Sequence, residues 1–160
     1  MRRKTILGLI TVLLCGAGML ATLSAQSPMA RNVFPADAIP YGPAPAFVPA
    51  GAQLAVLEGN PSGTTGDFTI RLKMPDGYRI APHWHPHREN VTVISGTLLV
   101  GMGDSFEESK MAGFSAGSFA YLEPNMHHYV KASGETVVQV HGQAPFQFNY
   151  IRSADDPSRK

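Results

Sequence analysis

Two histidines and a glutamate lie close together in residues 77–96, which read GYRIAPHWHPHRENVTVISG. His83 and His85 are two residues apart, so both imidazoles project from the same face of a β-strand, where side chains alternate. Pro86 interrupts that strand, because proline has no N–H to donate, and Glu89 opens a second apolar run that can return towards the histidines. Two neutral imidazoles and a carboxylate suit a divalent transition metal, in a site that often keeps positions open to water, oxygen or substrate.

The spacing of the whole stretch is more specific than the H-W-H triplet, which would also suit exposed loop histidines. The stretch has the pattern G-x5-HxH-x3-E-x6-G, and a second stretch, residues 117–130, reads GSFAYLEPNMHHYV. These two stretches resemble the two motifs of the cupin superfamily. The resemblance covers residues 51–151, and the chain is similar in particular to small exported single-domain cupins.

The resemblance implies an all-β fold, an antiparallel double-sheet jelly-roll barrel. It also implies one bound divalent transition metal, with iron, manganese, zinc and nickel left open. The metal ligands that it implies are His83, His85, Glu89 and His128.

The second motif departs from the usual pattern, in which a proline stands five residues and a glycine three residues before the histidine. Counting back from His128 gives Glu123 and Asn125 at these positions. His128 is preferred over His127 as the ligand, because the aromatic and aliphatic residues that usually follow the ligand come directly after it. Strand alternation lets only one of the two histidines face inward.

Two further polar residues are candidates for substrate binding in the same cavity. If residues 132–135 make a hairpin turn, His128 lies opposite Gln139, and His141 shares the face of Gln139. We therefore expect Gln139, His141 or both to point towards the metal. The alternative for His141 is a hydrogen bond to a loop at the end of its strand.

Length and composition agree with one domain that has many short strands. The chain has 160 residues, with 16 glycines, 13 prolines and a charged fraction of 16%. Its net charge of +1 and the lack of a basic stripe give no case for nucleic-acid binding. A short helix or solvated loop is expected near residues 105–111, and strands are predicted at 53–57, 68–74, 79–85, 91–94, 97–102, 118–122, 128–131, 136–141 and 146–151.

Residues 1–25 resemble a secretory signal peptide, with a basic start, an apolar run at residues 6–23 and small residues before the expected cleavage after Ala25. The alternative is a retained membrane anchor. With cleavage, the mature protein is periplasmic or secreted and does not contact a membrane. Because Cys15 is the only cysteine, the mature chain then has no disulfide, and its metal site must use nitrogen and oxygen ligands.

Residues 26–50 are predicted to be a proline-rich N-terminal arm, because prolines at this density prevent a helix and limit strand pairing to edges. The large apolar residues in this arm favour packing on the barrel or on a second subunit over a flexible spacer. Residues 152–160 form a polar C-terminal tail. A homodimer is expected by analogy with cupins, through the arm or the sheet edges.

The resemblance does not select one function, since cupins include enzymes, binding proteins and sensors. We expect a metal-dependent enzyme of the dioxygenase type that acts on a small organic molecule. An isomerase or lyase would use the same ligand set. The alternative from another class is a noncatalytic protein that binds a metal or a small ligand.

Overall fold

The computed structural model describes residues 32–159, so the predicted signal peptide at residues 1–25 lies outside the described residues. Within residues 32–159, nine strands and four short 3-10 helices follow one another. In order they are η2 (Ala36–Ala38), β1 (Gly42–Pro43), β2 (Gln53–Gly59), β3 (Asp67–Met74), β4 (Arg79–Trp84), β5 (Glu89–Met102), η3 (Glu108–Lys110), β6 (Ala112–Ser115), β7 (Phe119–Leu122), β8 (His128–Gln143), β9 (Asn149–Tyr150), η4 (Ser153–Asp155) and η5 (Pro157–Arg159).

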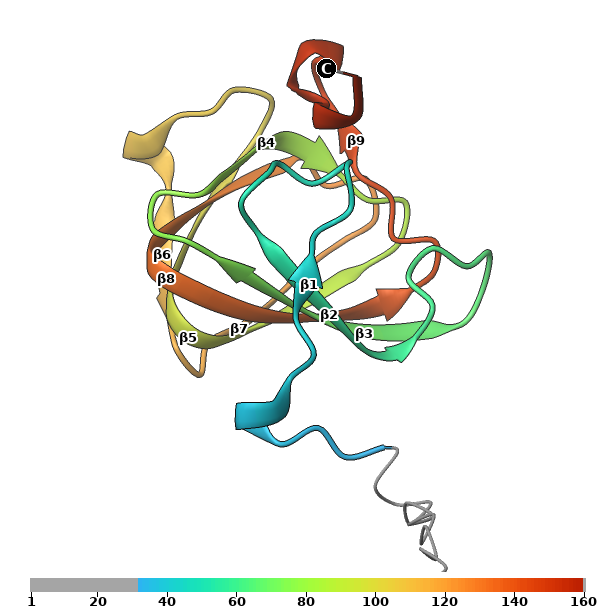
Figure 1. Ribbon diagram of the computed structural model, residues 1–160. Helices are drawn as coiled ribbons and strands as arrows, with labels where there is room; N and C mark the ends of the chain where they lie inside the picture. The colour runs from blue at the N-terminus through green and yellow to red at the C-terminus, as the bar shows by residue number, and fades with distance from the viewer. Residues whose placement is uncertain (1–31, 160) are drawn as a thin grey trace, which may run out of the picture. The chain divides into compact units, whose positions relative to one another are not determined.

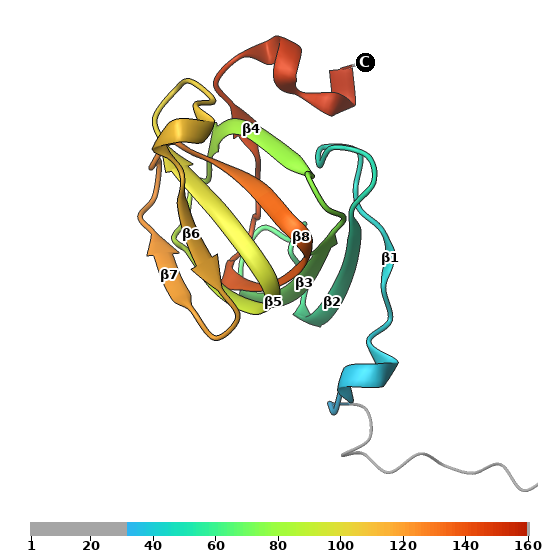
Figure 2. The ribbon, with the colours of Figure 1, turned by 90° about the vertical axis from the view of Figure 1, so that its left-hand side faces the viewer.

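The strands form a curled antiparallel sheet, which confirms the predicted all-β jelly-roll fold. Along one path the strand order is β1-β2-β3-β8-β4-β9, while β5 pairs with β6, β7 and β8. Figure 1 shows β8 running across the barrel, and Figure 2 shows β5, β6 and β7 on one side with β2 and β3 on the other. The interior between these two sides holds the site.

Two long strands replace four of the predicted short ones. β5 covers both 91–94 and 97–102, and β8 covers both 128–131 and 136–141. The register of β5 against β8 shifts around Ser95, next to Gly96, whose φ is 75°. The turn signals at Gly96 and Gly134 therefore mark corners at which a strand bends without reversing, as β-bulges do. β6, which pairs with residues 97–100 of β5, was not predicted.

The core follows the alternation of the strands. In β3 the even-numbered residues are buried, among them Ile70 at 1% exposure, and Val138 at 3% and Val140 at 4% follow the same alternation in the second half of β8. In β5 the buried residues change from odd-numbered Val91 and Val93 to even-numbered Leu98 across the bulges. The two register shifts therefore keep the apolar side of β5 facing inward as the strand passes from one side of the barrel to the other.

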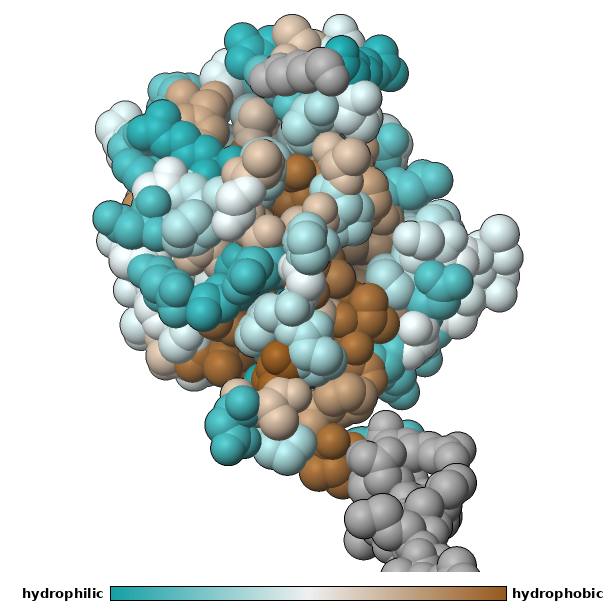
Figure 3. All heavy atoms as spheres, in the orientation of Figure 1, coloured by the Kyte–Doolittle hydropathy of each residue, from teal (hydrophilic) through white to brown (hydrophobic). Residues whose placement is uncertain are grey.

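Residues 41–50 run over the barrel and contact it. β1 pairs with β2, Val48 is 4% exposed, and the Tyr150 hydroxyl donates a 2.9 Å hydrogen bond to the Phe47 carbonyl. The Tyr78 hydroxyl donates to the Pro49 carbonyl. Figure 3 shows hydrophobic side chains on both sides of this segment. These contacts belong to the second half of the segment predicted as an arm, and residues 26–31 lie outside the described residues.

In the part of the chain that the structure describes, no helix is long and apolar enough to cross a membrane. The short helix expected near residues 105–111 is the 3-10 turn η3. Its Glu108 pairs with Arg79 and Lys131, so this loop is tied to the barrel through charged groups at the surface.

Candidate metal centre

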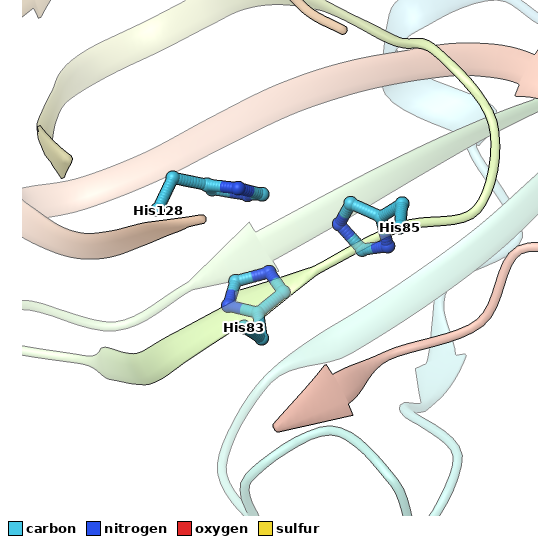
Figure 4. Close-up of side chains that lie close together, drawn as sticks. All are labelled: His83, His85 and His128. Carbon is cyan, nitrogen blue, oxygen red and sulfur yellow. The ribbon is translucent and has the colours of Figure 1, made fainter. Parts of the chain in front are cut away.

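Three histidines meet inside the barrel. His83 lies in β4, His85 directly follows that strand, and His128 is the first residue of β8, where it pairs with His83. Each offers a ring nitrogen, and these three nitrogens lie within 4.8 Å of one another. Figure 4 shows the three side chains turned towards the same space. All three are buried, at 2%, 4% and 2% exposure.

The backbone orients each imidazole through its Nδ1 atom. His83 Nδ1 is 2.8 Å from the Ala81 carbonyl, His85 Nδ1 is 2.6 Å from the Gln147 carbonyl, and His128 Nδ1 is 3.1 Å from the Met126 carbonyl. A carbonyl oxygen only accepts, so each Nδ1 must carry the proton and each Nε2 keeps a free lone pair. Outer hydrogen bonds of this kind are what fix the tautomer of metal-binding histidines.

Glu89 closes the group on one side. Its Oε2 atom lies 3.4 Å from His128 Nε2 and 3.6 Å from His85 Nε2, and the residue is 8% exposed. His85 Nε2 is buried without a hydrogen-bond partner. A buried nitrogen left without a partner is costly, and a metal ion bonded to it would remove that cost. The donor set therefore fits a divalent transition metal.

Burial keeps His83 and His85 neutral, which is the form that binds metal. Loss of hydration lowers the pKa of His83 well below its ordinary 6.5, and the neighbouring His128 and His85 lower it further. Burial also lowers the pKa of His85. For Glu89, burial raises the pKa, but His85 and His128 lower it more, so the carboxyl stays ionised at neutral pH. Neutral imidazoles and an ionised carboxylate need not lose protons before a metal binds.

These pKa shifts predict that the metal-free protein loses stability in mild acid. A histidine whose pKa is lowered by folding binds fewer protons in the folded state than in the unfolded state. Its contribution to stability is therefore fully present above pH 6.5 and falls as the pH drops below that value. The pKa of Glu89 is also lowered, so its contribution to stability falls as the pH drops below its ordinary pKa of 4.5. We expect the melting temperature without metal to fall between about pH 7 and pH 5. His83→Phe should flatten the fall and His87→Ala should not, whereas a pH-independent melting temperature would contradict the buried neutral state.

Two phenylalanines that the sequence analysis did not assign to the site cover the histidines. Phe148 stacks on His83 at a centroid distance of 4.8 Å and 16° between planes, and Phe146 stacks on His85 at 4.6 Å and 20°. The period-two pattern Phe146-x-Phe148-x-Tyr150 in the predicted strand 146–151 was the signal that could have found them. These rings shield the imidazoles from water and hold their orientation.

Beyond the histidines lies an apolar cavity of about 170 Å³. Its walls are mainly valine, leucine, isoleucine, methionine and phenylalanine side chains from both sides of the barrel. Val91 and Val93, which share the face of Glu89 by strand alternation, are among these lining residues. The site therefore joins a potential metal to a pocket for a small apolar group.

The structure does not bring Gln139 and His141 into this cavity, so that prediction is corrected. Residues 132–135 make no hairpin turn, because β8 continues through them. Strand alternation then places the even-numbered Val138 and Val140 inside the barrel and the odd-numbered residues of this part of β8 outside it. Gln139 instead accepts a 3.2 Å hydrogen bond from Arg71 Nε, and His141 is exposed in a polar groove on the outer side.

His127 points away from the site. Its Nδ1 lies 2.5 Å from Asp104 Oδ1, and its side chain is 38% exposed. Its neighbour His128 is buried among the other two histidines, as expected from alternation. Glu123, at the usual proline position of the motif, forms two hydrogen bonds with the Arg88 guanidinium, at 2.6 and 3.1 Å.

Asn125 takes the place of the usual glycine of the second motif. Its φ is 63°, in the left-handed region, and its N–H donates a 2.8 Å hydrogen bond to the His85 carbonyl. Asparagine tolerates this conformation better than most residues. The turn therefore keeps its shape without glycine and links the segment before His128 to His85.

We predict that Asn125→Gly leaves the free energy of unfolding nearly unchanged, whereas Asn125→Val lowers it by about 1–2 kcal/mol, because a β-branched residue is strained at this φ. Urea denaturation of both variants measures the difference. Equal stabilities of the two variants would show that the left-handed turn is not required.

The comparisons with known proteins agree with this geometry. A family profile described as "Cupin domain" matches residues 70–141. No curated protein sequence is significantly similar to this one. Solved structures with the same fold include KdgF from Halomonas sp., with 18% identity, a TM-score of 0.53 and coverage of 71% of this chain and 94% of the other.

Two further structures share the fold at low identity. The polyketide cyclase RemF from Streptomyces resistomycificus has 13% identity and a TM-score of 0.54, covering 68% of this chain and 76% of its own. A cupin 2 domain-containing protein from Halorhodospira halophila has 18% identity and a TM-score of 0.52, covering 68% and 79%. Residues 70–141 match the cupin domain profile, and the jelly-roll barrel and the histidine group agree with that match.

Proposed function

We propose that this protein is an exported cupin that binds one divalent transition metal and acts as a metal-dependent enzyme of the dioxygenase type on a small organic molecule. The proposed ligands are His83, His85, Glu89 and His128. The observation that carries the proposal is the orientation of the three imidazoles, each with Nδ1 held by a backbone carbonyl. A purely structural role does not require three Nε2 lone pairs directed into one buried space.

When bound, the metal would act as a Lewis acid with positions open to substrate and oxygen. The chain's own residues prepare this site. The imidazoles supply neutral nitrogen donors, Phe146 and Phe148 exclude water behind them, and the apolar cavity receives the body of the substrate. Glu89 is the only carboxylate among the described residues that line the cavity, which makes it the candidate to accept a substrate proton.

The same site supports a second candidate, a noncatalytic protein that binds a metal or a small ligand. This candidate is favoured because the cavity has few acidic or basic side chains. In an enzyme, Glu89 would have to serve both as a metal ligand and as a base. An isomerase or lyase would make the same demand on Glu89.

Oxygen uptake distinguishes the enzyme from the binder. The metal-loaded protein is incubated with a panel of small organic acids and phenols, and dissolved oxygen and products are measured together. If the protein is an enzyme, we expect it to consume oxygen and form a matching amount of product. This oxygen consumption should be lost in His83→Ala and kept in His127→Ala. A compound that raises the melting temperature but is recovered unchanged, with no oxygen consumed, would support the binder.

The proposed localisation, periplasmic or secreted, rests on the basic and apolar character of residues 1–25. The proposed partners are a small-molecule substrate and a second copy of the chain. Mass spectrometry of the protein exported by a bacterial host tests the first point, since cleavage after Ala25 predicts a mature chain that begins at Gln26. Light scattering of that mature protein tests the dimer.

A further inference from the structure

The cavity beside the histidines offers very few hydrogen bonds to a ligand. Among the described residues that line it, oxygen or nitrogen side-chain atoms come from His83, Glu89, Ser118 and His128, and no lysine or arginine contributes. A ligand with many hydroxyl groups would bury them without partners, which costs more free energy than binding returns. The body of the ligand must therefore be hydrocarbon.

The size and lining of the cavity favour a single aromatic ring. Its volume of about 170 Å³ is close to the ~150 Å³ of an apolar protein cavity known to hold benzene. The lining includes Phe47, Phe114, Phe119, Phe146 and Phe148. Aromatic side chains gain additional energy from edge-to-face and offset contacts with another ring. An aromatic ring therefore gains more here than a saturated ring of similar size.

Charge balance allows one negative charge on the ligand. Glu89 is the only ionised side chain in the described lining, so a bound divalent ion would leave a net charge of +1 at the site. One carboxylate or phenolate neutralises this charge. A second negative charge would find no cation in the apolar walls and would be strongly disfavoured.

Ser118 supplies a hydrogen-bonding group at the other end of the cavity. Its backbone carbonyl accepts a 3.0 Å hydrogen bond from the Val93 N–H, so it lies beside β5 four residues beyond Glu89, about 13 Å along the strand. Ser118 is among the residues that line the cavity, and its hydroxyl makes no hydrogen bond with any other described residue. It is free to bind a ligand group opposite the metal end.

We propose that the ligand of this site is a monoanionic compound with one aromatic ring, bound with its acidic group towards the histidines and a para hydrogen-bonding group towards Ser118. This inference rests on the proposed function, because it uses the charge of the bound metal. It assigns Ser118 as a specificity-determining residue and the phenylalanine-lined cavity as the ring pocket.

Isothermal titration calorimetry with three probes tests the substrate class. The mature protein is loaded with zinc, its metal content is measured, and benzoate, 4-hydroxybenzoate and glucuronate are titrated into it. All three probes are monoanionic rings, and only glucuronate carries several hydroxyl groups. We expect both benzoates to bind and glucuronate to bind at least tenfold more weakly. A protein that carries metal but binds glucuronate as tightly as benzoate would overturn the inference and leave the proposed function standing, whereas a protein without metal would refute the proposed function itself.

Two variants and one control locate the binding. Ser118→Ala should weaken 4-hydroxybenzoate about fivefold to tenfold, the loss of one neutral hydrogen bond, and leave benzoate unchanged. Ser115→Ala, at an exposed position of β6, should change neither. Ala120→Phe should fill the cavity and abolish binding of both benzoates while metal content is retained. Equal weakening of both benzoates by Ser118→Ala, or unchanged binding in Ala120→Phe, would overturn the proposed orientation or the proposed pocket.

Discussion

Replacing His128 by alanine is expected to lower the affinity of the protein for a divalent transition metal by more than about 100-fold, because loss of a supporting residue alone costs 10–100-fold. His128 is 2% exposed, and its Nε2 atom lies 3.4 Å from Glu89 Oε2. Its loss removes one of three converging nitrogens and leaves Glu89 without the closer of its two histidine neighbours. Elemental mass spectrometry of the mature protein, purified without chelator, measures the metal content of each variant.

His127→Ala is the matched control for this prediction. His127 is adjacent in the sequence and of the same type, but it is bonded to Asp104 at the surface. The control should keep the metal content of the unsubstituted protein. Loss of metal in both variants, with both folded, would point to a general disturbance of the turn, and loss only in His127→Ala would exchange the roles of the two histidines.

Replacing Gly96 by alanine is expected to lower the free energy of unfolding by about 3 kcal/mol or more, a large part of the stability of a single domain. Gly96 has a φ of 75°, which costs a residue with a side chain about 1–2 kcal/mol. A Cβ atom there would also lie 2.4 Å from the Glu135 carbonyl oxygen and 2.8 Å from Thr136 Cα. The backbone of β5 or β8 would have to move at the corner of the barrel.

Gly77→Ala separates the two contributions. Gly77 has a φ of 72°, but a Cβ atom there would meet nothing within 4 Å, so only the conformational cost of about 1–2 kcal/mol applies. Urea denaturation of the two variants measures the difference between them. Equal losses would show that the close approach of β5 to β8 at Gly96 contributes nothing to stability.

The histidine group was predictable from the sequence because its signals are local. The two-residue spacing of His83 and His85 needs only the alternation of one strand, and the structure brings both to His128. The choice of His128 over His127 needed only the residues that follow. The roles of these residues as ligands stay predictions.

The positions of Gln139 and His141 could not be predicted in this way, because they depended on whether the chain reverses near Gly134. A glycine with positive φ serves equally in a hairpin turn and in the corner of a continuous strand. The local sequence does not separate the two. Only the pairing of β8 with β3 and β5 at once shows that the strand continues.

The aromatic cover of the site was missed for a different reason. The segment 146–151 was predicted as a strand, but Phe146 and Phe148 meet the histidines only through the folding of the C-terminal segment against β4, where His83 pairs with Tyr150. A contact between residues about sixty positions apart leaves no spacing signal in one sequence.

Anomalous diffraction at the absorption edge of the bound metal, from crystals of the metal-loaded mature protein, tests the central claim most directly. We predict one peak per chain, within about 2.3 Å of Nε2 of His83, His85 and His128 and of a carboxylate oxygen of Glu89. A peak bonded through Nδ1, a peak at the surface near His127, or no peak from fully loaded protein would contradict the account.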